Sequence, residues 1–113
     1  MIGGDLRTKP VKLQTTDTAI FTSNKERRQI LGIWLCNTTA GAITATVKVT
    51  RSAVEYELIS SKSIAANDYL FIGNQGNGPI WAMSNGDILE GNCSTNDAIH
   101  CHVVYTTLGT AGT

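Results

Sequence analysis

Three consecutive residues near the end of the chain, His100, Cys101 and His102, are the first candidates for chemistry. All three are metal-ligand types, and a Cys–His pair can form a nucleophilic dyad. They lie in the apolar stretch "AIHCHVVY", residues 98–105, which we read as the closing β-strand. Successive side chains of a strand point to opposite faces, so His100 and His102 share one face and Cys101 takes the other. The three therefore cannot converge on one ion, and neither histidine can activate Cys101.

Few other ligands could complete a site around these histidines. The chain has no further histidine, and Cys36 and Cys93 lack the paired Cys-x-x-Cys spacing of zinc sites. We predict no metal and no cofactor, and we interpret Cys101 as a small buried hydrophobic residue. A spatial pairing of Cys36 or Cys93 with a histidine stays open.

The stretch "GNQGNG", residues 73–78, resembles a phosphate-binding loop only in its glycines. Such a loop needs a following Lys-Ser/Thr and a helix N-terminus, whereas "PIWAM" follows here. We interpret it as a connection between strands that contacts a partner through Asn74 and Asn77. For Trp34 and Trp81, core packing is the favoured interpretation in so small a domain. Trp81, beside this loop, remains the candidate contact for a glycan.

Acid–base or covalent catalysis finds no support in the pattern. Asp87 follows the Asn85-Gly86 turn signal, and an aspartate at a turn usually bonds its own backbone. Nothing indicates a cleft between Asp87 and Glu90, as a glycosidase would need. There is no Gly-x-Ser-x-Gly elbow. We predict that the protein is not an enzyme and has no catalytic residues.

Charge is balanced overall but uneven along the chain. All nine Lys and Arg lie in residues 1–62 with five acids, and residues 63–113 carry four acids and neither Lys nor Arg. The net charge of zero favours neither nucleic acid nor a membrane surface as partner. The basic residues could instead bind an acidic protein surface. The candidate contacts are Arg7, Lys9, Lys12, Lys25, Arg27 and Arg28.

No targeting or membrane-spanning pattern is present in the sequence. The opening "MIGGDLRTKP" lacks the apolar region of a signal peptide, and no apolar run approaches a membrane span. Three cysteines without paired spacing do not form a disulfide framework. We therefore expect assembly in a reducing cytoplasm.

The elements that must position these residues follow a period of two. In residues 42–50, Ile43, Ala45, Val47 and Val49 alternate with polar residues, as in a half-buried antiparallel strand. Residues 27–37 are apolar on both faces, and "NTTAGA" between the two segments predicts a hairpin loop. In the next strand, Val54, Tyr56 and Leu58 are expected to point inward and Glu55 and Glu57 outward.

Continued along the chain, this pattern predicts an all-β fold. We expect a single antiparallel β-sandwich or jelly-roll-like domain of about eight strands over residues 16–106. Residues 1–15 are predicted to be a polar N-terminal arm and residues 107–113 a flexible C-terminal tail. Because sheet edges must be covered, we also expect a homo-oligomer.

Several segments together resemble small virion proteins of tailed bacteriophages. They are "LCNTTAGAITATVKV", "YELI", "SIAANDYLFIG", "GDILEG" and "AIHCHVVY", within residues 16–106. The resemblance implies a non-enzymatic β-sandwich in the virion, assembled in the host cytoplasm and bound to major capsid or neck/tail subunits. Capsid decoration (cement) is the favoured role, and a neck/collar or tail accessory protein is the alternative. A receptor- or glycan-binding module is a further alternative, and no catalytic residue is carried over.

Overall fold

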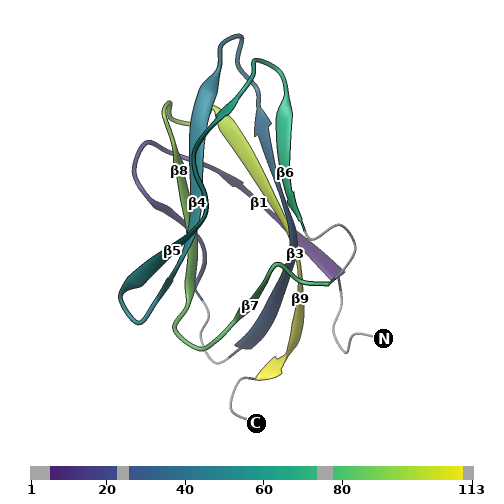
Figure 1. The fold of residues 1–113 in the computed structure, drawn as a ribbon. Helices are drawn as coiled ribbons and strands as arrows, with labels where there is room; N and C mark the ends of the chain where they lie inside the picture. The colour runs from purple at the N-terminus through teal and green to yellow at the C-terminus, as the bar shows by residue number, and fades with distance from the viewer. Residues whose placement is uncertain (1–5, 23–25, 74–77, 111–113) are drawn as a thin grey trace.

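The computed structural model describes residues 6–22, 26–73 and 78–110 and is all-β. Its strands form two antiparallel sheets that face each other (Figure 1). The strands are β1 (Leu6–Lys12), β2 (Thr18–Thr22), β3 (Glu26–Asn37), β4 (Ile43–Arg51), β5 (Val54–Ile64), β6 (Tyr69–Gly73), β7 (Trp81–Met83), β8 (Ile88–Cys93) and β9 (Ile99–Thr110). The described residues include no helix long and apolar enough to span a membrane.

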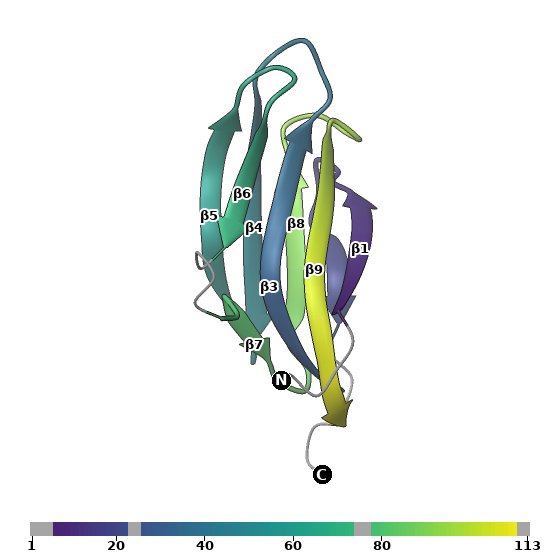
Figure 2. The ribbon, with the colours of Figure 1, turned by 90° about the vertical axis from the view of Figure 1, so that its right-hand side faces the viewer.

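The two sheets draw their strands from the whole length of the chain. Sheet A has the order β1-β9-β3-β6, and β7 also pairs with β3, at Arg28–Ile30, whereas β6 pairs with Gly32–Cys36. Sheet B has the order β2-β8-β4-β5. Figure 2 looks onto sheet A, with the strands of sheet B behind it. The predicted antiparallel β-sandwich is confirmed.

The core lies between the sheets and is built by alternating residues of each strand. On β9, Cys101 and Val103 are fully buried, as are Ile33 and Leu35 on the paired β3. From sheet B, the face of β4 predicted to be apolar meets them. Its buried members are Ile43, Ala45, Val47 and Val49.

Part of the expected N-terminal arm is a strand. Within residues 1–15, Leu6–Lys12 form β1 and pair with β9 in unbroken register, from Leu6 opposite Thr106 to Lys12 opposite His100. Most of this strand is exposed, as an edge strand can be, so its sequence lacks the apolar alternation that marks a half-buried strand. At the other end, β9 continues to Thr110, past the expected start of the tail at residue 107.

Two predicted turns connect the sheets rather than closing hairpins. The "NTTAGA" loop joins β3 in sheet A to β4 in sheet B, so the hairpin predicted there is wrong. The Asn85-Gly86 turn likewise joins β7 to β8 across the sandwich. Among the described strands, β4 and β5 are the consecutive pair that hydrogen-bond to each other. Turn residues signal a chain reversal, but they do not state which sheet receives the next strand.

The inward residues of β5 are more exposed than expected. Tyr56 lies opposite Val49, on the core side, yet it is 41% exposed because β5 is an edge strand. Val54 is 51% exposed for the same reason. Leu58 is skipped in the pairing of β4 with β5, where the register shifts, and is the extra residue of a β-bulge.

Candidate functional site

The outer face of sheet A gathers most of the chemically distinctive residues of the chain. Directly paired residues of antiparallel strands share a face, so the strand register gives its composition. Its residues, from β6 to β1, are Tyr69, Phe71 and Gly73; Gly32, Trp34 and Cys36; Val104, His102 and His100; and Thr8, Pro10 and Lys12. This set has aromatic, imidazole and one lysine side chain and no carboxylate.

Three exposed aromatic residues form a cluster at the β6 side of this face. Trp34, Tyr69 and Phe71, here called the aromatic cluster, are 40%, 57% and 45% exposed. The Trp34 ring lies 4.5 Å from the Phe71 ring and 5.4 Å from the Tyr69 ring, centroid to centroid. Core packing of Trp34, predicted from the sequence, is therefore wrong. Both faces of β3 are apolar, and the sequence did not show which of them sheet B covers.

Two glycines make room for the central ring of the aromatic cluster. A Cβ atom added to Gly32 would lie 2.7 Å from Phe71 Cε1, and one added to Gly73 would lie 2.3 Å from Phe71 Cε2. The Phe71 ring therefore lies over the backbone of Gly32 and Gly73 and occupies the space that their side chains would otherwise fill.

The histidines and cysteine of "AIHCHVVY" are divided between two faces, as predicted. His100 and His102 are half-buried on the outer face, opposite Cys36 and Trp34 of β3. Cys101 is fully buried in the core, and this burial raises the pKa of its thiol to about 12. A thiol held neutral in this way is a packing residue and not a nucleophile.

A shallow pocket lies beside the histidines. It has a volume of about 270 Å³ between β1 and β9, and Pro10, Lys12, His100 and His102 contribute to its walls. The pocket is a depression in the outer face of sheet A and not a cavity in the core.

A group of carboxylates that could hold a cation lies at sheet B, and the ammonium group of a lysine already contacts it. Among the described residues, Asp17, Glu55 and Glu90 form the group whose ligand atoms lie within 4.8 Å of one another. The nearly buried Lys48 ammonium lies 2.9 Å from Asp17 Oδ2 and 2.8 Å from Glu55 Oε2. The Lys48 hydrogen bond, helped by Asn92, lowers the pKa of Asp17, and bonds to Glu55 and Asp17 raise the pKa of Lys48. Lys48 thus serves as the internal counter-ion of this cluster.

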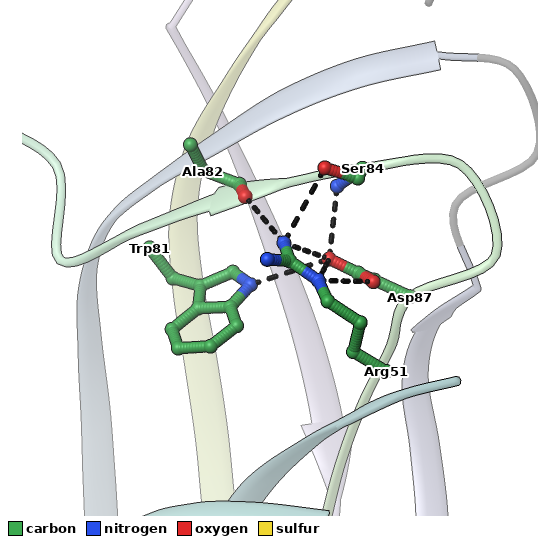
Figure 3. A network of polar contacts seen from close by, with 5 residues as sticks. All are labelled: Arg51, Trp81, Ala82, Ser84 and Asp87. Carbon is green, nitrogen blue, oxygen red and sulfur yellow. Dashed lines mark hydrogen bonds and ion pairs between the residues drawn. The ribbon is translucent and has the colours of Figure 1, made fainter. Parts of the chain in front are cut away.

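A second polar network joins the two sheets at the turn between β7 and β8 (Figure 3). Asp87 is 1% exposed, and Arg51 at the end of β4 donates to both of its oxygens, at 2.9 Å from Nε and 2.6 Å from Nη2. The Ser84 backbone N–H and the Trp81 indole N–H also donate to Asp87. Burial alone would raise the pKa of Asp87, but the bonds from Arg51, Ser84 and Trp81 together lower it. The expectation that Asp87 bonds its own turn is confirmed. Its ion pair with Arg51 lies within sheet B, and the bonds of Arg51 to the Ala82 carbonyl and of Trp81 to Asp87 connect this pair to β7 of sheet A.

Trp81 belongs to this network rather than to an open sugar platform. Its ring is half-buried, with the Arg51 guanidinium 5.1 Å from its centroid and the Tyr56 ring 6.3 Å away. Asn74 and Asn77, the other predicted contacts of this region, lie outside the described residues.

The predicted basic contacts that the structure describes lie on β1 and β3. Lys9 and Arg28 lie over the Phe21 ring of sheet B, at 5.0 and 4.7 Å from its centroid. Arg7 and Lys12 are exposed on the edge strand β1. Lys25 and the side chain of Arg27 lie outside what the structure describes. Among the described residues, three of the six exposed large hydrophobic side chains belong to the aromatic cluster.

Comparison with known proteins supports the fold. No protein-family model and no curated protein matches this chain. A solved structure of infectious bursal disease virus, Gx strain, is similar with a TM-score of 0.50 and 9% identity, over 100% of this chain and 33% of that one. A T13 particle of the same virus gives a TM-score of 0.49 and 11% identity, over 95% of this chain and 31% of that one. The chain spans about a third of the length of these structures, and at such identity the first likeness shows the β-sandwich fold alone.

Proposed function

We propose that this chain is a non-enzymatic structural protein of a virus particle that binds other virion subunits. The observation that carries the proposal is the fold, because the whole chain shares its β-sandwich with a solved virus structure. The resemblance of its strand and turn segments to small phage virion proteins supports the same class. Within that class we propose a capsid decoration protein of a tailed bacteriophage, bound to major capsid subunits.

The chemistry of the described residues supports binding rather than catalysis. The Lys48 and Arg51 ion pairs neutralise the carboxylates that they contact, and Cys101 lies in the core. On the outer face of sheet A the molecule exposes an aromatic cluster to solvent. Exposed aromatic groups on a rigid surface are typical of protein interfaces.

Counting copies in purified particles tests the proposed position. A decoration protein binds throughout the capsid lattice and should be present in hundreds of copies, and particles lacking it should rupture at lower temperature. A dozen copies or fewer would contradict decoration and would favour a neck/collar or tail accessory protein. Absence of the chain from purified particles would contradict the virion role altogether.

The exposed aromatic cluster also favours a second candidate, a glycan-binding module on the virion. Sugars stack on aromatic rings, and Trp34 is more open to such a ligand than Trp81. Glycan-array binding that is lost in Trp34→Ala and retained in Leu6→Ala would support this candidate. Leu6 is a suitable control because it is exposed on the opposite edge of the same sheet.

A further inference from the structure

The strands at the edges of the two sheets differ in how well they are protected from pairing with another chain. An edge strand presents unpaired N–H and C=O groups, and proteins block such edges with charges, proline, bulges or a covering group. The edges to compare are those of β1, β2, β5, β6 and β7.

Two of these edges are blocked by their own residues. On β1, Arg7, Lys9 and Lys12 surround Pro10, which has no N–H to donate. On β5, Glu55, Glu57 and Lys62 are exposed, and the register with β4 is broken twice. A second copy brought against either edge across a two-fold axis would oppose like charges or broken register.

Two further edges are blocked by distortion or by a neighbour. The pairing of β2 with β8 shifts between Ala19 and Phe21, and the cations of Lys9 and Arg28 lie over the Phe21 ring. β7 is three residues long, and Arg51 donates to its Ala82 carbonyl oxygen at 3.2 Å.

Among the described residues, the edge of β6 has none of these protections. Its sequence, Tyr69-Leu70-Phe71-Ile72-Gly73, has no charge and no proline, and it pairs with β3 in unbroken register. None of the described strands pairs with its other side. Tyr69 and Phe71 stand exposed on its outer face, while Leu70 and Ile72 are half-buried against the core.

We propose that β6 is the dimerisation edge of the protein, where it pairs antiparallel with β6 of a second copy across a two-fold axis at Phe71. Sheet A then continues from one subunit into the other. The two aromatic clusters meet on the outer face, and the exposed rings that look like a sugar platform become interface residues.

The character of β6 supports a second copy as its partner. With Phe71 on the axis, Leu70 lies opposite Ile72 of the second copy, so the core-facing sides match as apolar pairs. Tyr69 lies opposite Gly73, which has no side chain to crowd it, and Phe71 lies opposite itself. A two-fold contact places a charge near the axis next to its own copy, and among the described edge strands β6 combines freedom from charge with unbroken register. The three rings do not offer one common stacking plane to a sugar, because the Trp34 ring is tilted by 44° to the Tyr69 ring and by 40° to the Phe71 ring.

Sedimentation across a concentration series tests this proposal with a charge exchange at the axis. The wild-type chain should shift from 12.1 kDa to twice that mass as its concentration rises. Phe71→Lys and Phe71→Glu should each raise the dissociation constant at least about tenfold, because like charges then face each other across the strands. An equimolar mixture of the two variants should recover the dimer, since opposite charges now meet. Leu6→Glu, with the charge on the β1 edge of the same sheet, should dimerise like the wild type.

Hydrogen exchange locates the contact independently. Amide protection that rises with protein concentration should be confined to the peptide containing Tyr69–Gly73. Because Phe71 covers Gly32 and Gly73, each variant is first checked for wild-type circular dichroism, and Tyr69→Lys provides a second disruption of the same edge that leaves Phe71 in place.

Three results would each overturn the proposal. They are a wild-type chain that stays monomeric at millimolar concentration, Phe71 variants that dimerise as well as the wild type, and a mixture that stays monomeric. Glycan binding by a strictly monomeric chain would assign the aromatic cluster to a sugar instead. The measurement uses the isolated chain, so its failure is distinct from failure of the proposed virion role.

Discussion

At the scale of single residues, the three cysteines differ in their access to solvent. Cys36 is half-buried on the outer face of sheet A, whereas Cys93 and Cys101 are buried. A neutral maleimide should therefore modify Cys36 first in the folded protein, and Cys93 and Cys101 only as the sandwich opens. Peptide mass mapping over time measures the order. Modification of Cys101 at the rate of Cys36 in native buffer would contradict the packing of β9.

Asp87 is the residue whose loss should weaken the sandwich most directly. Asp87→Asn removes the charge that pairs with Arg51 and should lower the free energy of unfolding by about 2 kcal/mol. The loss is smaller than the about 3–5 kcal/mol of a fully buried pair because the Arg51 side chain is 41% exposed and can be rehydrated. Urea unfolding monitored by Trp fluorescence gives the value.

The stabilisation from Asp87 should also depend on pH in a defined direction. Its folded pKa is lowered from 3.8, so the carboxylate contributes fully above that value and the contribution is lost as pH falls through the folded pKa. The stability gap between wild type and Asp87→Asn should therefore shrink as the pH falls from 3.8 through the folded pKa of Asp87. A gap that stays constant over this range would show that the native carboxylate has no lowered pKa.

Residue-level chemistry was predictable where it depended on local alternation. The division of His100, Cys101 and His102 between two faces follows from the period of a strand alone. The exposure of Trp34 was not predictable in the same way, because β3 is apolar on both faces and only the placement of sheet B decides which face is covered. The ion pairs of Lys48 with Asp17 and of Arg51 with Asp87 unite residues that are distant in sequence, and no spacing marks them.

At the scale of elements, the β4–β5 hairpin contains a strained turn. Ser52 and Ala53 have φ angles of 51° and 64°, a left-handed geometry that Asn-Gly adopts at little cost in such turns. The double change Ser52→Asn with Ala53→Gly should therefore stabilise the protein by about 1 kcal/mol. Thermal unfolding should show this as a rise in Tm of about 5 °C.

A glycine at an ordinary strand position provides the control for that prediction. Ala82 on β7 pairs with Gln29 in unbroken register and has no positive φ, so Ala82→Gly should lower the Tm. A fall in Tm for the turn variant as well would mean that the hairpin does not use the left-handed geometry.

The positions of the elements were more predictable than their pairing. Strands were expected near β2 to β9 from alternation and turn residues, and these expectations were largely correct. Pairing depends on which sheet receives each strand after a loop, and both the "NTTAGA" loop and the Asn85-Gly86 turn cross the sandwich instead of closing hairpins. Local turn chemistry is the same in both cases.

At the scale of the whole molecule, β1 covers one edge of β9 and so protects that edge from pairing with another chain. Deleting residues 1–12 would leave one edge of β9 unpaired from His100 to Thr106. We expect the truncated chain to aggregate, as measured by light scattering, because an open apolar strand edge pairs with other chains. A synthetic peptide of residues 6–13 should suppress this aggregation, whereas a scrambled peptide should not. A truncated chain that stays monomeric and folded would show that β1 is dispensable.

The overall architecture was predictable as a class, but its first strand was not. β1 is polar, contains a proline and is mostly exposed, so its sequence resembles an arm, and only pairing with β9 identifies it as part of sheet A. Edge strands carry little core signal because they bury little.

The pairing of β1 with β9 has a consequence for how the molecule forms. β9 is the last of the described strands to be synthesised, so sheet A cannot close until the residues of β9 have left the ribosome. The β4–β5 hairpin can form from a short local segment well before that. The final docking of β9 between β1 and β3 must overcome the entropy of closing a very long loop, so we expect refolding on the slow side for a small domain, in milliseconds to seconds. A chain stalled before residue 99 would contain all the strands of sheet B but would lack β9 between β1 and β3 of sheet A. The unpaired edges of β1 and β3 are where we expect a chaperone to bind such a chain.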